Sequence, residues 1–153
     1  DRLIVNFQTI VAFKNRFKAQ KVFYMKSKKA IRFMPAFFWL VVIVVLSGYP
    51  GNQLPRSAVW QLDKLVHTFM YATLALLLFF PFRQQFFKKE QQLKISCVIL
   101  FFSIAFGGLM EVLQTNVFIN RSGSWMDFLA NTAGAILGVL LAPLMLKYLP
   151  INK

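Results

Sequence analysis

The chain has 153 residues, of which 58% are apolar and 15% are charged, and its formal net charge is +13. Soluble domains average about 45–50% apolar and about 25% charged residues. A soluble helical bundle needs a polar outer face on every helix, and this sequence has too few polar residues to supply those faces. The composition therefore argues against a soluble enzyme, a disordered chain and a disulfide scaffold, and it indicates an integral membrane protein.

Residues 1–33 form a basic segment ahead of the first apolar run, and nine of the 18 Lys and Arg residues lie in it. Met25 is followed by Lys-Ser-Lys-Lys, which is typical of a translation start, so we expect Met25 to be an alternative or the true first residue. Residues 1–24 could otherwise form a basic amphipathic helix on the inner leaflet. Residues 25–48 also have the order of a signal peptide, but no clear small-x-small cleavage motif follows them.

Four apolar segments follow, and the sequence predicts a transmembrane helix for each. They run from Met34 to about Tyr49, over Leu65–Phe82, over Ile95–Met110, and from Trp125 to about Leu149. Each comes near the ~17–25 residues that cross ~30 Å of hydrocarbon. Lipid offers no hydrogen bonds to the backbone, so helices are expected rather than strands. The predicted fold is an all-α bundle of four transmembrane helices over residues 34–149, with a short tail at 150–153.

The distribution of basic residues predicts how these helices are oriented. Fifteen Lys and Arg residues fall in the N-terminal segment, the second connection and the C-terminal end, and only three fall in the first and third connections. Basic residues concentrate on the cytoplasmic side of membrane proteins. We therefore expect both termini to be cytoplasmic. The positive charge is explained by this topology, so we expect no nucleic-acid partner.

Polar side chains recur at helical spacing in three of the predicted helices. A spacing of three or four residues places each group on one face of its helix; the groups are Asp63, His67 and Tyr71, then Glu111 and Gln114, then Asp127 and Asn131. The predicted topology brings all of them to the outer half of the membrane, with Arg121 of the third connection above them. Ionisable groups at this depth are unfavourable unless they face one another or a wet cavity. We predict a polar pocket in which Arg121 bridges at least one acid.

Each of these residues also has a purely structural interpretation. Asp63 could cap a helix, Tyr71 could be an interfacial anchor, and Asn131 could bond two helices together. His67, Glu111 and Asp127 could in principle hold a divalent metal, but a single His without a tight ligand motif is a weak signal. We therefore expect no metal and no cofactor. Further along the fourth helix, Gly134 and Gly138 form a small-x-x-x-small pattern that permits close helix packing.

Two ordered motifs resemble the signatures of the VanZ-like membrane proteins of bacteria, over about residues 34–146. The stretch LPRSAVWQLDKLVHTFMYATLALLL contains a Leu-Pro loop followed by Asp-Lys-x-x-His-x-x-x-Tyr. The stretch GLMEVLQTNVFINRSGSWMDFLANTAGAILG contains Glu-x-x-Gln, an Arg, and Asp-x-x-x-Asn-x-x-Gly-x-x-x-Gly. The family usually has a Pro shortly before the Arg, where this chain reads Val-Phe-Ile-Asn.

The resemblance implies a protein of the bacterial cytoplasmic (inner) membrane that is associated with low-level resistance to teicoplanin, a lipoglycopeptide. The motif positions fall on residues already singled out, namely Asp63, Lys64, His67, Tyr71, Glu111, Gln114, Arg121, Asp127, Asn131, Gly134 and Gly138. We expect membrane lipids as partners, and a pocket that engages a cell-wall precursor lipid or a lipoglycopeptide. Arg121 suits a phosphate or carboxylate group, because its guanidinium can bind two oxygens at once.

Two other functions stay open at the level of the sequence. In a membrane enzyme, His67 beside Glu111 or Asp127 would act as acid and base on a lipid-linked substrate. No convincing nucleophile accompanies them, because Ser122 and Ser124 lie in a loop without a recognisable motif. A small oligomeric transporter is the third alternative, although the four segments show no clear internal repeat.

The predicted topology can be tested with a reporter enzyme that is active only outside the cytoplasm. Fusions near Asn52 or Asn120 are expected to be active, and fusions near Gln91 or after Lys153 inactive, because basic residues stay on the cytoplasmic side. The reporter's activity in intact cells, corrected for expression, is the measurement. The opposite pattern would place the polar residues in the inner leaflet.

Overall fold

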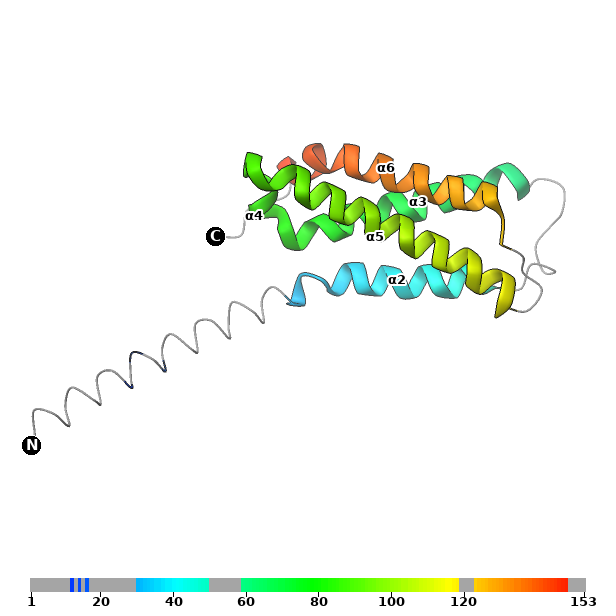
Figure 1. Ribbon diagram of the computed structural model, residues 1–153, viewed down its shortest axis with the longest axis horizontal. Coiled ribbons are helices and arrows are strands. Elements are labelled where there is room, and N and C mark those ends of the chain that lie inside the picture. The colour runs from blue at the N-terminus through cyan, green and yellow to red at the C-terminus, as the bar shows by residue number, and fades with distance from the viewer. Residues whose placement is uncertain are drawn as a thin grey trace, which may run out of the picture.

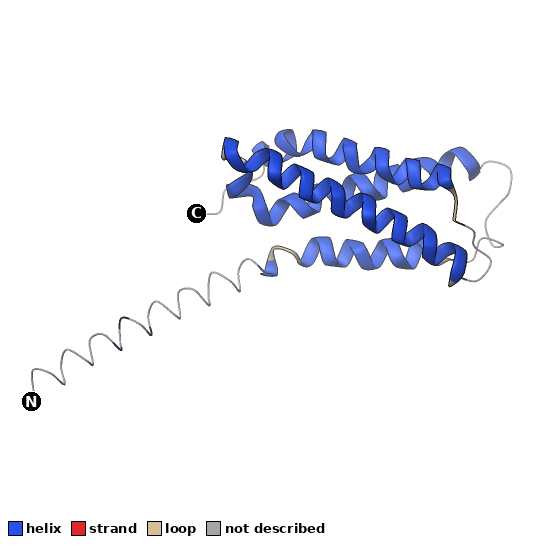
Figure 2. Cartoon of the chain, viewed as in Figure 1, coloured by secondary structure: helices blue, strands red, loops and turns tan. Residues whose placement is uncertain are grey.

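The described part of the chain consists of helices joined by short turns. A computed structural model describes residues 30–49, 59–118 and 123–148, together with residues 12, 14 and 16. The elements, in chain order, are α2 (Met34–Ser47), α3 (Val59–Phe79), the 3-10 turn η2 (Phe80–Phe82), α4 (Arg83–Phe86), α5 (Lys89–Asn116) and α6 (Trp125–Tyr148). The four longer helices lie side by side (Figures 1 and 2). The all-α prediction is confirmed for the described residues, which contain no strand.

Three stretches are long and apolar enough to cross a membrane: Leu62–Phe86, Lys89–Asn116 and Trp125–Tyr148. The helix α2 is shorter, with 14 residues. At ~1.5 Å per residue it covers ~21 Å, which is less than the ~30 Å of a hydrocarbon core. The prediction of four transmembrane helices is thus confirmed for three of them, and the crossing by α2 stays a prediction.

The observed helices extend past the apolar segments that predicted them. The helix α5 begins at Lys89 and ends at Asn116, whereas the expected span was Ile95–Met110. Polar residues at the membrane surface continue a helix because its backbone hydrogen bonds are satisfied within the segment. The region around Pro81 forms the 3-10 turn η2, since proline lacks the backbone N–H that an α-helix would use there.

The outer surface of the bundle carries large apolar side chains. Leu93, Phe101 and Leu140 are 74%, 75% and 68% exposed. Soluble monomers rarely expose contiguous apolar patches of more than a few hundred Å². The buried residues are packed between the helices, with Tyr71 and Phe79 of α3 almost completely enclosed. The exposed apolar surface therefore faces lipid, which supports an integral membrane protein.

The closest helix pair is α3 and α6, which approach each other at two glycines. A Cβ atom added at Gly134 would overlap the carbonyl oxygen of Thr68, and one added at Gly138 would lie 2.5 Å from the carbonyl oxygen of Ala72. Thr68 also donates its hydroxyl hydrogen bond across the interface to the carbonyl of Ala130, at 3.3 Å. Any side chain larger than hydrogen would push the two helices apart here.

The helix α2 is attached to the bundle by two hydrogen bonds in addition to apolar contacts. The indole N–H of Trp39 donates to the carbonyl of Met70 on α3, at 2.9 Å. The amide Nε2 of Gln114 on α5 donates to the carbonyl of Ser47 at the end of α2, at 3.1 Å. Gln114, which the sequence placed in the polar pocket, thus lies buried against α2.

Replacing the interface glycines by alanine tests the close contact between α3 and α6. A control glycine outside this contact accounts for the effect of alanine on helix propensity. Gly134→Ala and Gly138→Ala are expected to destabilise the protein, because overpacking costs ~1–3 kcal/mol. Gly108→Ala is the matched control: its Cβ would lie 3.5 Å from Phe128, an ordinary contact. The control variant should gain up to ~1 kcal/mol in free energy of unfolding, because alanine has a higher helix propensity than glycine. Thermal unfolding in detergent measures all three, and equal melting temperatures would contradict the close α3–α6 contact.

Candidate functional site

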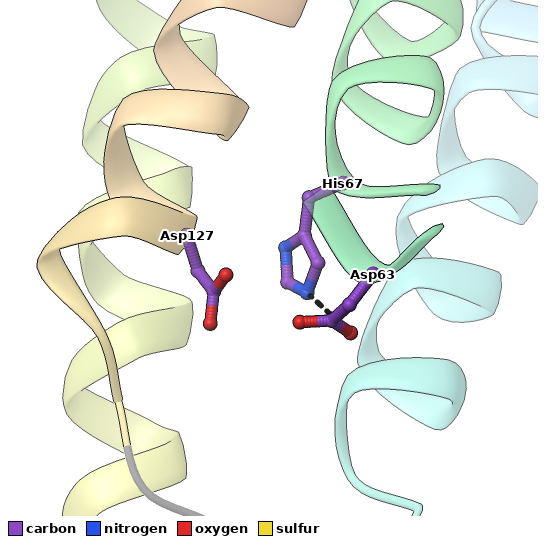
Figure 3. A group of neighbouring side chains, drawn as sticks. All are labelled: Asp63, His67 and Asp127. Carbon is purple, nitrogen blue, oxygen red and sulfur yellow. Dashed lines mark ion pairs between the residues drawn. The ribbon is translucent and has the colours of Figure 1, made fainter. Parts of the chain in front are cut away.

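The polar cluster lies at one end of the bundle, where α3 and α6 begin and α5 ends (Figure 1). The first turns of α3 present Asp63 and His67, which are four residues apart and share a face. The first turn of α6 presents Asp127 opposite them, as Figure 3 shows. His67 and Asp127 are buried, and Asp63 is partly buried. Side chains separated by more than 50 positions in the sequence are thus brought together.

Lys64 provides the positive charge within this cluster. Its ammonium group donates hydrogen bonds to Oδ1 of Asp127 and, at 3.3 Å, to Oδ2 of Asp63. The ammonium therefore links an acid of α6 to an acid of α3. The side chains of Lys64 and Asp127 are 20% and 11% exposed, so this ion pair is largely shielded from water. Shielded charges are tolerated when they are paired in this way.

Sequence reasoning gave Lys64 no role of its own. Adjacent residues point to different faces of a helix, so the spacing that groups Asp63 with His67 does not include Lys64. The long, flexible lysine stem overcomes that difference in direction. The signal that could have revealed its role is the basic residue inside an otherwise apolar helix, where an unpaired charge is unfavourable. Arg121, the cation predicted to bridge the acids, lies outside the described residues.

A second chain of hydrogen bonds indicates which ring nitrogen of His67 carries a hydrogen. The Nδ2 amide of Asn131 donates to Oε1 of Glu111 at 3.1 Å, so its Oδ1 faces the other way. This Oδ1 lies 2.9 Å from Nδ1 of His67. An amide oxygen can only accept, so Nδ1 must carry a hydrogen. A neutral His67 then has its lone pair at Nε2, and Nε2 lies 3.9 Å from Oδ1 of Asp63 (Figure 3).

Glu111 joins this hydrogen-bonded chain to the loop before α6. Its Oε2 accepts the backbone N–H of Ser124 at 2.9 Å, so both of its carboxylate oxygens have partners. The neighbouring N–H of Gly123 donates to the hydroxyl of Thr115 at 3.1 Å. A Cβ atom at Gly123 would overlap the carbonyl oxygen of Glu111, so the loop can lie this close to α5 only with glycine there.

A cavity of about 540 Å³ lies beside Glu111, between the end of α5 and the start of α6. Its polar lining includes Glu111, Thr115 and Asn116, and its apolar lining includes Trp125 and Phe128. Ligand-binding pockets of proteins typically measure ~300–1,000 Å³. The cavity is therefore large enough for a small headgroup or part of a larger amphipathic molecule.

Asp63, His67 and Asp127 also form a group of metal-ligand type. One ligand atom from each residue lies within 4.8 Å of the others. Two carboxylates and an imidazole suit Mg²⁺, Mn²⁺ or Zn²⁺. The Lys64 ammonium already binds both carboxylates, however, so a metal ion would have to displace it. In the described arrangement, the ammonium of Lys64 pairs with both carboxylates of this group.

Tyr71 lies one turn deeper on α3 than His67 and is 1% exposed. Its hydroxyl has no hydrogen-bond partner among the described residues. The ring is close to Gly107, where an added Cβ would lie 3.3 Å from Tyr71 and 3.2 Å from Asn131. Tyr71 thus borders the hydrogen-bonded network without joining it.

The structure brings together five residues of the predicted pocket: Asp63, His67, Glu111, Asp127 and Asn131.

Comparison with known proteins identifies the family of the chain. The sequence profile of the VanZ/LLP1 family matches residues 2–146. The chain belongs to the VanZ/LLP1 family. No curated protein and no solved structure matches the chain significantly. For this VanZ/LLP1 protein, the chemistry of the site must therefore be argued from its own residues.

The role of Lys64 can be tested with a double-mutant cycle. Lys64→Met should destabilise the protein by less than the ~3–5 kcal/mol of a fully buried pair, because both groups are partly exposed. Asp127→Asn in the Lys64→Met background should recover part of that loss, since it removes an uncompensated charge. Thermal unfolding of the single and double variants provides the cycle. Strictly additive effects would mean that Lys64 and Asp127 do not interact.

Proposed function

We propose that this membrane protein uses the cavity beside Glu111 to bind the polar part of a cell-envelope lipid or a lipoglycopeptide. The observation that carries the proposal is the combination of a carboxylate and an apolar wall in one cavity. Glu111 can accept hydrogen bonds from ligand amines and hydroxyls, and the apolar side chains of Trp125 and Phe128 suit an acyl chain or ring. An amphipathic ligand would satisfy both halves of this lining.

The hydrogen bonds around the cavity support binding by a preorganised site. Glu111 is oriented by Asn131 and by the backbone of Ser124, so it does not have to rearrange when a ligand arrives. Arg121 lies three residues before Ser124 in the same connection. We propose that Arg121 binds a phosphate or carboxylate of the ligand, for which its planar group is suited.

The proposed location follows from the apolar helices and the charge distribution. We propose a multi-pass protein of the bacterial cytoplasmic membrane with both termini inside, so that the cavity opens to the outer leaflet. A lipoglycopeptide reaches the membrane from that side. If the protein captured the antibiotic, or the precursor that the antibiotic recognises, the antibiotic would have less effect on the cell. This is in keeping with the teicoplanin tolerance associated with VanZ-like proteins.

Catalysis is the second candidate, favoured by the geometry of His67. Its Nδ1 is held by Asn131, which leaves Nε2 as the group that can take a proton. Asp127 or Glu111 would complete an acid–base pair on a lipid-linked substrate. Turnover of a labelled lipid precursor by the purified protein distinguishes catalysis from binding alone.

The binding proposal is tested by substitutions at the cavity in a host where this gene confers teicoplanin tolerance. Glu111→Gln and Arg121→Lys should abolish tolerance while the protein still accumulates in the membrane. Loss of a charged hydrogen bond costs ~1.5–3 kcal/mol, or roughly tenfold or more in affinity. The minimal inhibitory concentration and the affinity of purified protein for teicoplanin or a lipid precursor are measured together.

Glu90→Gln is the matched control, because Glu90 is an exposed acid at the opposite end of the same helix. It should retain full tolerance and affinity. Full tolerance in both cavity variants at normal expression would refute the proposal, as would an equal loss in the control.

A further inference from the structure

Two further cavities lie at the opposite end of the bundle, where η2 and α4 face the beginning of α5. A cavity of about 330 Å³ is lined entirely by apolar residues, among them Phe37, Leu40 and Phe102. A neighbouring cavity of about 300 Å³ is lined by Gln85, Gln91 and Lys94 at its polar end. The two cavities share Phe82, Val98 and Ile99 in their linings. The two cavities are therefore adjacent, and the pair is called the groove below; one part of it is apolar and the other has a polar end.

The dimensions of the groove match a lipid chain in one leaflet. Its lining on α5 runs from Gln91 to Phe102. At ~1.5 Å per residue, this stretch covers ~17 Å along the helix. One leaflet contributes about half of the ~30 Å hydrocarbon core, or ~15 Å. An acyl chain lying along α5 would thus be accompanied by apolar side chains for most of its length.

Basic residues predominate near the polar end of the groove. Residues 83–94 contain four basic residues and one acid, Glu90. Lys94 lines the groove and makes no ion pair with the residues that the structure describes. A lysine at this depth can extend its ammonium along the apolar wall toward the membrane surface. Basic groups between helices at this surface attract anionic headgroups.

We propose that this groove binds one phospholipid with an anionic headgroup, with an acyl chain along α5 and the phosphate near Lys94. The site is separate from the cavity beside Glu111, because it lies at the other end of the bundle, where α4 and α5 meet (Figure 1). Here α2 contacts the bundle through apolar side chains, including the edge-to-face pair of Phe33 and Phe82 at 5.6 Å. The bound chain fills the space that α2 leaves beside α5.

The experiment uses the full chain in a neutral detergent, with phosphatidylglycerol or phosphatidylcholine of identical acyl chains. Native mass spectrometry counts the lipids that stay bound to each protein. The native chain should retain one phosphatidylglycerol in preference to phosphatidylcholine. Lys94→Gln should lose that preference by about tenfold, the effect of one charged contact. Lys89→Gln is the matched control, since Lys89 lies at the same end but lines neither cavity, and it should keep the preference.

Val98→Trp tests the apolar part of the groove, because Val98 lines both cavities. The larger side chain should reduce retention of both lipids. Unchanged retention in this variant would overturn the proposal. The proposal also fails if Lys94→Gln keeps the preference, if Lys89→Gln loses it equally, or if the native chain retains both lipids equally. The Lys94 comparison remains decisive if Val98→Trp does not fold, since Lys94 is exposed.

Discussion

The close contact between α3 and α6 is the constraint on which the site depends. At Gly134 and Gly138 the backbone of α6 lies against carbonyl groups of α3, and no side chain separates them. The polar residues of both helices occupy the turns next to this contact. A wider separation would move Asp127 away from Lys64 and Asn131 away from His67. In a membrane, where apolar burial does not drive association, such packing is a main source of helix affinity.

The groups of the polar cluster pair with one another, which lowers the cost of holding them in an apolar surrounding. Lys64 binds an acid on each of α3 and α6, and Glu111 orients Asn131, which in turn orients His67. The carboxylate of Glu111 can only accept, so the amide nitrogen of Asn131 donates to it and the amide oxygen faces His67. The hydroxyls of Tyr71 and Ser103 are the buried side-chain groups without a partner in the described part of the chain. They lie toward the apolar centre, beyond the network.

The bundle therefore has two chemically different ends. One end holds the compensated cluster and a cavity with a carboxylate, and the other has excess basic residues and an apolar groove. This asymmetry follows from the direction of the helices: α3 and α6 begin at the end of the bundle where α5 finishes.

The sequence by itself determined the helical fold, three of the transmembrane helices and the polar faces, because apolar length and helical spacing are local properties. It also indicated the closeness of Asp63, His67, Glu111, Asp127 and Asn131, since helix direction places them at one end. It did not reveal that Lys64 pairs with Asp127 or that Gln114 binds α2. Those contacts depend on the rotation of each helix about its own axis and on the distance between helices, and both are decided by side-chain packing. The lysine stem can reach several partners, and only the tertiary structure decides that it binds Asp127 together with Asp63.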